Sequence, residues 1–347
     1  KTALFNNILV NRERYTNQRN WIPMNRKLFA VAVIFVAMVL ALPVTAGTLS
    51  PITKHFGMCD ASAAVPVGSN LFVVANDEDN TLRIYKRNES GESIYSQDIS
   101  SFLQIDPKHP EADIEGATRI KNRIYWIASH GSNKESKTRP NRHRFFATEI
   151  ETIGGKFNLK PIGMPFLGLV KAFEDSPELK GYNLGESAKN APESKNGLNI
   201  EGLTKTPQGA LLIGFRNPIP EGNALLVPLE NPQEVITGNE KPKLGKPILL
   251  ALNGLGIRSI EYSDAKGAYF IIAGPYDDNG SFKLYQWSGN PSEAPESIKT
   301  DFRGLHPEAL VVYPEKKETI QILSDDGSKS INGQNCKGLA KAQDMSF

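Results

Sequence analysis

The sequence has 347 residues, 39% of them hydrophobic, and a formal net charge of +2 at pH 7. A chain with this much apolar material can bury a large core, and an all-β chain of this length commonly forms one domain. The nearly balanced charge excludes the strongly basic class of nucleic-acid-binding proteins, so we expect no nucleic-acid partner.

The first 46 residues form two segments that precede the expected domain. Residues 1–23 are polar and irregular, and we expect them to be a non-native extension upstream of a start at Met24. Residues 24–46 combine a basic start, an apolar run and a small-residue cleavage site, which is typical of a secretory signal peptide. A membrane anchor is the alternative, but a span needs about twenty apolar residues and this run is shorter. We therefore expect a periplasmic or secreted protein without a stable membrane span after cleavage.

A short phrase returns five times in the remaining chain, each time where a strand is expected. It is clearest in Ile114–Ala117 and Ile200–Leu203, which read Ile-Glu-Gly followed by Ala or Leu. An apolar run and a hairpin follow each copy, and a period of about fifty residues built of short strands is typical of propeller blades. The acidic position of the phrase is occupied in turn by Asp60, Glu115, Glu201, Arg258 and Glu308.

The fourth copy can be aligned in two ways, because Glu261 could also occupy the acidic position. Aligning residues 256–260 with 199–203 also brings Lys-Gly-Ala at 266–268 to within one residue of Gln-Gly-Ala at 208–210. The flanking residues therefore favour Arg258.

The repeats predict an all-β fold, a single five-bladed β-propeller over residues 50–347. An insertion at residues 166–197, with a short helix near Leu169, accounts for the long spacing between the second and third copies. The last blade lacks a strand, and we expect Ser50–Phe56 to supply it, so that the N- and C-terminal segments close the ring. A six-bladed ring is the alternative, with the insertion or the C-terminal tail as a degenerate blade.

The chain has two cysteines, Cys59 beside the first repeat and Cys336 near the C-terminus. In an exported protein they are expected to form a ring-closing disulfide. Two unpaired buried thiols are the alternative, because the sequence does not show the Cα separation that a disulfide requires.

In a propeller the start of each inner strand shares a rim with the end of its hairpin partner. Four carboxylates on such a rim repel one another, and protonation, Arg258 or a bound cation would relieve the repulsion. Oxygen ligands suit Ca²⁺ or Mg²⁺, so we expect a calcium site formed by Asp60, Glu115, Glu201 and Glu308. The alternative is that backbone amides satisfy the acids. The partner strands add His130, Arg216 and the acidic turns 77–79 and 325–326, which we interpret as plain turns.

The connection at residues 133–144 is long and basic. With His130 and His143 beside it, its residues Arg139 and Arg142 could hold a phosphate or carboxylate, while Arg258 receives the same anionic end. A solvated loop is the alternative interpretation.

Familiar catalytic motifs are absent from the sequence: it has no G-x-S-x-G, H-E-x-x-H, Walker or C-x-x-C motif. We therefore expect a propeller that binds a small polar or anionic ligand at the charged rim. The alternative is a hydrolase of phosphate or carboxylic esters that uses rim carboxylates or a metal-activated water.

Three stretches, Gly57–Ala64, Glu111–Ala117 and Arg139–Phe146, resemble a bacterial family catalogued as domain of unknown function 3616, over about residues 52–347. The repeated Ile-Glu-Gly phrase is more distantly similar to the propeller family labelled esterase-like activity of phytase. That second resemblance implies a phosphate-ester or ester substrate.

Overall fold

The computed structural model describes residues 52–277, 279–315, 319–339 and 344–347. The expected extension at 1–23 and the expected signal peptide at 24–46 lie outside these ranges. Within them, no helix combines the length and apolar character needed to cross a membrane.

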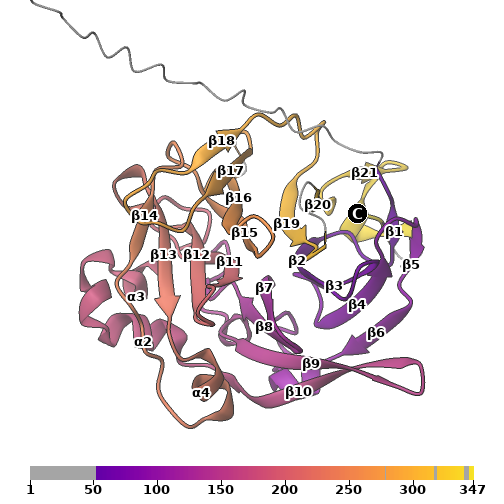
Figure 1. The fold of residues 1–347 in the computed structure, drawn as a ribbon, viewed down its shortest axis with the longest axis horizontal. Coiled ribbons are helices and arrows are strands. Elements are labelled where there is room, and N and C mark those ends of the chain that lie inside the picture. Colours follow the sequence, from indigo (N-terminus) through magenta and orange to yellow (C-terminus); the bar gives the residue numbers. More distant parts are fainter. Residues whose placement is uncertain (1–51, 278, 316–318, 340–343) are drawn as a thin grey trace, which may run out of the picture. The chain divides into compact units, whose positions relative to one another are not determined.

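Four antiparallel sheets of four strands each make up most of the fold (Figure 1). The first contains β2 (Ala61–Pro66), β3 (Leu71–Asn76), β4 (Thr81–Lys86) and β6 (Tyr95–Asp98), and the second contains β7 (Ile114–Ile120), β8 (Arg123–Ala128), β9 (Phe145–Ile153) and β10 (Lys156–Phe166). The third contains β11 (Asn199–Lys205), β12 (Leu211–Asn217), β13 (Ala224–Leu229) and β14 (Ile248–Leu250). The fourth contains β15 (Gly256–Ser263), β16 (Ala268–Gly274), β17 (Lys283–Trp287) and β18 (Glu296–Ile298).

A two-stranded sheet of β19 (Pro307–Val312) and β20 (Ile320–Ser324) follows. The first strand of each of these five sheets lies innermost, and β2, β7, β11, β15 and β19 are neighbours in that order, with β19 returning to β2 (Figure 1). This radial arrangement of sheets is an all-β propeller, as the repeats predict.

Side-chain hydroxyls link neighbouring inner strands. Thr118 Oγ1 on β7 accepts a hydrogen bond from Lys205 N on β11 over 3.2 Å. Thr204 Oγ1 on β11 accepts one from Tyr262 N on β15 over 2.9 Å. Ser259 Oγ on β15 likewise accepts one from Leu310 N on β19 over 3.0 Å. Each bond satisfies a backbone donor where two sheets meet, so the sheets are joined by polar contacts as well as by apolar packing.

Apolar side chains fill the spaces between successive sheets. Trp126 and Phe146 are buried in the cluster that the first and second sheets share, and Phe145 and Phe215 in the cluster shared by the second and third. The strands read as continuous apolar runs because they are covered on both faces.

The insertion packs against the core through α2 (Leu169–Asp175), whose Leu169 and Phe173 are buried. The predicted helix near Leu169 is therefore present. The remaining helices are short: α1 (Ser100–Leu103), α3 (Leu184–Ser187), α4 (Pro232–Thr237), and 3₁₀ turns at Pro140–Arg142, Pro177–Tyr182, Pro220–Gly222 and Cys336–Gly338.

The N-terminal segment does not complete the last sheet. Instead β1 (His55–Phe56) pairs in parallel with β5 (Gly91–Glu92), and His55 exchanges backbone hydrogen bonds of 3.1 and 3.2 Å with Phe347. The expectation that Ser50–Phe56 adds a strand to the last blade is therefore wrong for its described residues 52–56, because these pair with β5 and with the C-terminus and not with β19 or β20, while residues 50 and 51 lie outside the described ranges. A second small hairpin, β21 (Ser330–Ile331) and β22 (Gln334–Asn335), leads to Cys336, which forms a disulfide with Cys59 at a Cα–Cα distance of 5.9 Å.

Candidate functional site

Each inner strand contains a β-bulge near its start, where the pairing with its hairpin partner skips one residue. The skipped residues are Ser62, Glu115, Glu201, Arg258 and Glu308. A bulge redirects its side chain out of the pleat, and residues of all five inner strands line a small void between those strands. The sheet geometry thus presents five side chains to one central channel.

The bulges decide the alignment of two repeats. Arg258 is the bulged residue of the fourth copy, as the flanking residues predict, and Glu261 lies further along β15. In the first copy the bulged residue is Ser62, so the assignment of Asp60 to that position is wrong by two residues. Asp60 precedes β2 and forms an isolated β-bridge with Asp325.

A small residue follows each bulge because the inner strands approach closely there. A Cβ atom on Gly202 would lie 2.9 Å from Ile257 Cγ2 and 3.0 Å from Gly214 Cα. A Cβ atom on Gly116 would lie 2.8 Å from Ile127 Cγ2. The Ile-Glu-Gly phrase is thus a packing signature: a bulge that turns a side chain inward, followed by a residue with little or no side chain.

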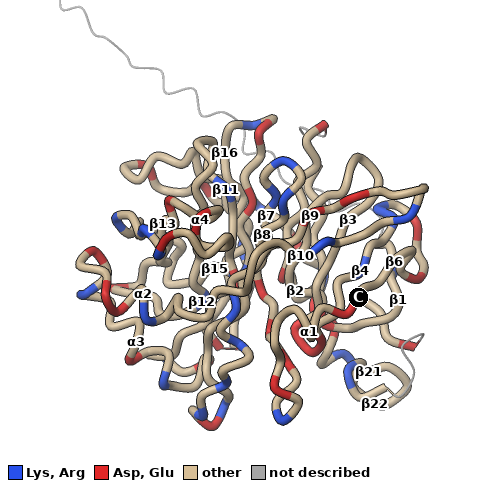
Figure 2. Tube along the Cα trace, turned by 90° about the horizontal axis from the view of Figure 1, so that it is seen from below, with Lys and Arg blue, Asp and Glu red and all other residues tan. Residues whose placement is uncertain are grey.

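A cavity with a volume of about 1350 Å³ lies at this end of the channel. The loops at both ends of the strands carry residues of either sign (Figure 2), but acids predominate in the lining of the cavity. The described lining residues include the acids Asp60, Asp77, Glu78, Glu111, Asp113, Glu115, Glu135, Glu193, Glu201, Asp277, Glu308 and Asp325, and the bases Lys134, Arg139, Arg142, Arg216, Arg258 and Lys337.

One wall of the cavity is neutralised by buried ion pairs. Arg258 Nε lies 3.1 Å from Glu308 Oε2 and 3.0 Å from Glu201 Oε2, although Glu201 Oε2 receives no well-aligned hydrogen bond. Arg216 Nη1 donates to Glu201 Oε1 over 3.1 Å. Both arginines are engaged by carboxylates, so Arg258 offers an anion a guanidinium group that is already paired with Glu201 and Glu308. Glu201 and Glu308 likewise pair with arginine here, and neither belongs to the two described groups of acids whose oxygens lie close enough to share a cation.

The opposite wall is acidic. Oxygens of Asp60, Asp77 and Glu78 lie within 4.8 Å of one another, and so do oxygens of Asp77, Asp113 and Glu115. Burial, followed by the charge of Asp325, raises the pKa of Asp60 to about 7. Asp77 and Glu115 are half-buried yet lie deep among protein atoms, and this desolvation, together with the neighbouring carboxylates, raises the pKa of each well above its ordinary value. These acids repel one another unless they bind protons or a cation.

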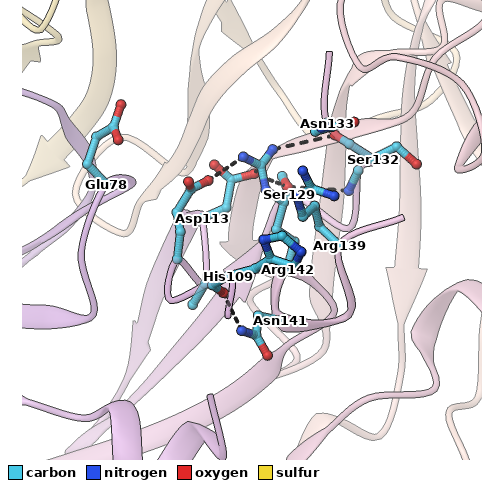
Figure 3. Close-up of polar contacts among 12 residues, drawn as sticks. Glu78, His109, Asp113, Ser129, Ser132, Asn133, Arg139, Asn141 and Arg142 are labelled. Carbon is cyan, nitrogen blue, oxygen red and sulfur yellow. Dashed lines mark hydrogen bonds and ion pairs between the residues drawn. The ribbon is translucent and has the colours of Figure 1, made fainter. Parts of the chain in front are cut away.

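Arg142 connects this wall to the basic loop (Figure 3). Its Nη1 lies 3.0 Å from Asp113 Oδ2, its Nη2 contacts Glu111 Oε1, and Ser129 Oγ also donates to Asp113 Oδ2. Asp113 and His130 both have a φ of +58°, which is uncommon for residues other than glycine and recurs at functional sites. Burial raises the pKa of Asp113 although Arg142 opposes the change.

The basic loop is only partly available to a ligand. Arg144 is buried and donates to the carbonyls of Leu103 and Pro140, each over 2.7 Å. His130 is also buried, its Nδ1 lies 2.7 Å from Ala128 O, and burial, followed by the charge of His143, lowers its pKa to about 3. Neither His130 nor His143 lines the cavity, so their expected place on the rim is wrong. Arg139 and Lys134 do line it.

Sequence reasoning missed the importance of Asp77, Asp113, Asp325 and Lys337. Asp77 and Asp325 belong to the acidic turns that were interpreted as plain turns, yet both line the cavity. Their place at the ends of β3 and β20, on the expected rim, was the available signal. Lys337 comes from the segment held by the disulfide, and no local pattern marks it.

Comparison with known proteins gives a family and no activity. The family described as Protein of unknown function (DUF3616) matches residues 60–154 and 167–330. No curated protein matches the sequence. Glutaminyl cyclase from Myxococcus xanthus aligns with 12% identity and a TM-score of 0.43, covering 79% of this chain and 90% of its own. The PQQ-bound aldose sugar dehydrogenase from Streptomyces coelicolor aligns with 11% identity and a TM-score of 0.47, covering 84% and 97%. At these scores neither structure carries an argument about function.

Proposed function

Because the chain belongs to the family described as Protein of unknown function (DUF3616), we propose its function from the cavity: the propeller binds a small polar ligand that carries an anionic group. The observation that carries this proposal is one charged cavity of about 1350 Å³ at the end of the channel. Small-molecule pockets commonly measure about 300–1000 Å³, so the cavity can hold such a ligand together with ordered water.

Two cations of the basic loop are placed to receive the anionic group. Lys134 is exposed, and its Nζ lies 4.0 Å from Glu135 Oε1, a long contact. Arg139 is half-buried and donates a 3.4 Å hydrogen bond to Thr138 O. A guanidinium group can bind a carboxylate or phosphate through two parallel hydrogen bonds. The acidic wall would repel an anion, so the proposal includes a calcium ion between that wall and the ligand.

The experiment is calorimetric titration of the protein with inorganic phosphate and with glucose 6-phosphate, each with and without CaCl₂. Arg139→Gln should weaken binding about tenfold, since a hydrogen bond to a charged group contributes about 1.5–3 kcal/mol. Lys137→Gln is the matched control, because Lys137 is an exposed cation of the same loop outside the cavity lining. Equal affinities of the two variants, or no heat with wild type, would contradict the proposal.

One observation favours hydrolysis as a second candidate function. Asp60 and Asp325 form an isolated β-bridge and both line the cavity, and the pKa of Asp60 is raised to about 7 by burial and by the charge of Asp325. A carboxyl group with a pKa near the working pH can act as a general acid. Release of p-nitrophenol from its phosphate or acetate ester would support a hydrolase, provided that Asp60→Asn abolishes it. Activity that survives this substitution would remove Asp60 from the mechanism.

We also propose that the protein acts in the periplasm or outside the cell and has five blades. The Cys59–Cys336 disulfide supports export, because such bonds persist in oxidising compartments. The ring order of the five inner strands supports counting β19 and β20 as a shortened blade. The N-terminal mass of protein recovered from a periplasmic extract tests the export, and a start near Gly47 is expected.

A further inference from the structure

Three carboxylates of the acidic wall are placed to share one cation. Asp77 follows β3, Asp113 precedes β7, and Glu115 is the bulged residue of β7. Their ligand oxygens lie within 4.8 Å of one another. Clusters of acids are common on proteins, so the assignment depends on what the surrounding groups leave unpaired.

Asp113 is oriented by two donors that bind the same oxygen. Ser129 Oγ and Arg142 Nη1 both approach Oδ2, and no described residue forms a hydrogen bond with Oδ1. Outer donors of this kind fix a carboxylate so that its second oxygen can face a metal. Asp77 Oδ1 is also buried without a hydrogen-bond partner among the described residues.

Asn199 gives the independent observation. The residue is 6% exposed, its Nδ2 donates to Glu201 Oε1 over 2.8 Å, and its Oδ1 has no hydrogen-bond partner in the described chain. Asn199 lines the same cavity. Ser129 N donates to Asp113 O and Ser129 O accepts from Ile200 N, each over 2.9 Å, so one residue joins the starts of β7 and β11. A buried amide oxygen without a donor among the described residues, in an acid-lined cavity, is an acceptor that a cation can bind.

We propose that Asp77, Asp113, Glu115 and Asn199 bind one Ca²⁺ ion at the acidic wall. All four ligands are oxygens, which suits a hard cation and disfavours zinc or copper. Carboxylate and amide oxygens around an open cavity fit the irregular, larger shell of Ca²⁺ better than the strict octahedron of Mg²⁺. The sites left open on the ion face the cavity, where the anionic group of the ligand would complete the shell. This last step rests on the proposed function.

The experiment titrates the EDTA-treated protein with CaCl₂ or MgCl₂, and records the melting temperature and the heat of binding. We expect Ca²⁺ to raise the melting temperature, with a Kd at or below about 0.1–1 mM, the range of extracellular calcium modules. Asp77→Asn and Glu115→Gln should weaken Ca²⁺ binding at least tenfold. Both should also raise the melting temperature in EDTA, because they relieve repulsion between the acids. A loss of structural hydrogen bonds would instead lower it.

Glu193→Gln is the matched control, since Glu193 lines the same cavity outside both acidic groups and should leave Ca²⁺ affinity unchanged. Asn199→Ala should weaken Ca²⁺ binding without the gain in EDTA, because it removes no charge. The site is refuted if Ca²⁺ leaves the wild-type melting temperature unchanged, or if Glu193→Gln loses as much affinity as Glu115→Gln. If Ca²⁺ binds but phosphate and glucose 6-phosphate do not, the calcium site is supported and only the proposed function is refuted.

Discussion

Lys337 Nζ lies 2.8 Å from Glu78 Oε1, and the neighbouring Cys336 is bonded to Cys59. The C-terminal segment is therefore fastened to the first sheet at the edge of the cavity by one ion pair and one covalent bond. Lys337 N also donates to Gly327 O over 3.2 Å, and Asp326 N donates to Cys59 O over 2.9 Å. The disulfide and the ion pair therefore hold the C-terminal segment in place beside the acidic wall.

Replacing both cysteines, Cys59→Ser with Cys336→Ser, should lower the free energy of unfolding by about 2–5 kcal/mol, because the unfolded chain loses a long closed loop. Urea unfolding measures the change. Lys337→Met is the comparison, and it should cost at most about 1 kcal/mol, because its partner Glu78 is exposed. An unchanged unfolding midpoint in the double variant, or two free thiols in the denatured, unreduced protein, would show that the bond does not form.

Arg258→Met should lower the free energy of unfolding by about 3–5 kcal/mol, because Glu201 and Glu308 would remain buried with uncompensated charge. Lys86→Met is the control. It removes an exposed pair with Glu89 and should change stability by at most about 1 kcal/mol. Urea unfolding of the two variants would disprove the buried network if both lost the same small amount.

Asp60→Asn should stabilise the protein in alkaline solution and have little effect below pH 4. The folded pKa of Asp60 is raised to about 7 from an ordinary 3.8, so the folded state binds this proton more tightly than the unfolded state. The resulting stabilisation is complete below the unfolded pKa and is lost as the pH rises through about 7. Melting temperatures between pH 3 and pH 9 measure the effect.

Asp98→Asn should change stability with pH in the opposite direction. Hydrogen bonds from Ser100 lower the pKa of Asp98, so its stabilisation is present above pH 3.8 and is lost in acid. Asp98→Asn should therefore lower the melting temperature at neutral pH and converge with wild type at low pH. Parallel pH profiles for the two variants would argue against the burial of Asp60.

Gly202→Ala should destabilise the propeller by about 1–3 kcal/mol, because its Cβ would meet Ile257 Cγ2 at 2.9 Å and the backbone of Gly214 at 3.0 Å. Gly181→Ala is the control, since a Cβ there meets nothing within 4 Å. Thermal unfolding should show no loss for Gly181→Ala. If the two variants melted together, close packing would not be the reason for the Ile-Glu-Gly phrase.

The sequence was sufficient to predict the propeller and the inner strands because the repeated phrase coincides with a β-bulge at the start of each inner strand. Glu115, Glu201 and Glu308 were aligned correctly, and even Arg258 was found from its flanking residues. The first copy was misaligned because it has Ser62 in place of the acid and Ala63 in place of the glycine. The nearby acid Asp60 was therefore taken for the acidic position.

The electrostatic partners could not be predicted in the same way. Contacts between different sheets determine which carboxylates pair with Arg216 and Arg258. The same contacts determine which carboxylates remain together with Asp77 and Asp113. His130 illustrates the limit: it lies at the expected strand end, but its left-handed backbone and buried ring keep its side chain away from the cavity. The sequence predicted which residues lie at the strand ends near the rim. Side-chain direction and pairing between distant residues determine which of these side chains line the cavity.

The bulge at the start of every inner strand places different constraints on two neighbouring residues. The residue after each bulge must stay small for the strands to fit, while the bulged residue turns toward the channel and already varies among serine, glutamate and arginine. Arg258 pairs with Glu201 and Glu308, so these three bulged residues have to change together, whereas Ser62 lies outside this ion-pair network. A library that replaces the three paired residues as a set would change the charge that the channel presents to a ligand, while the small residues after the bulges keep the strands in place.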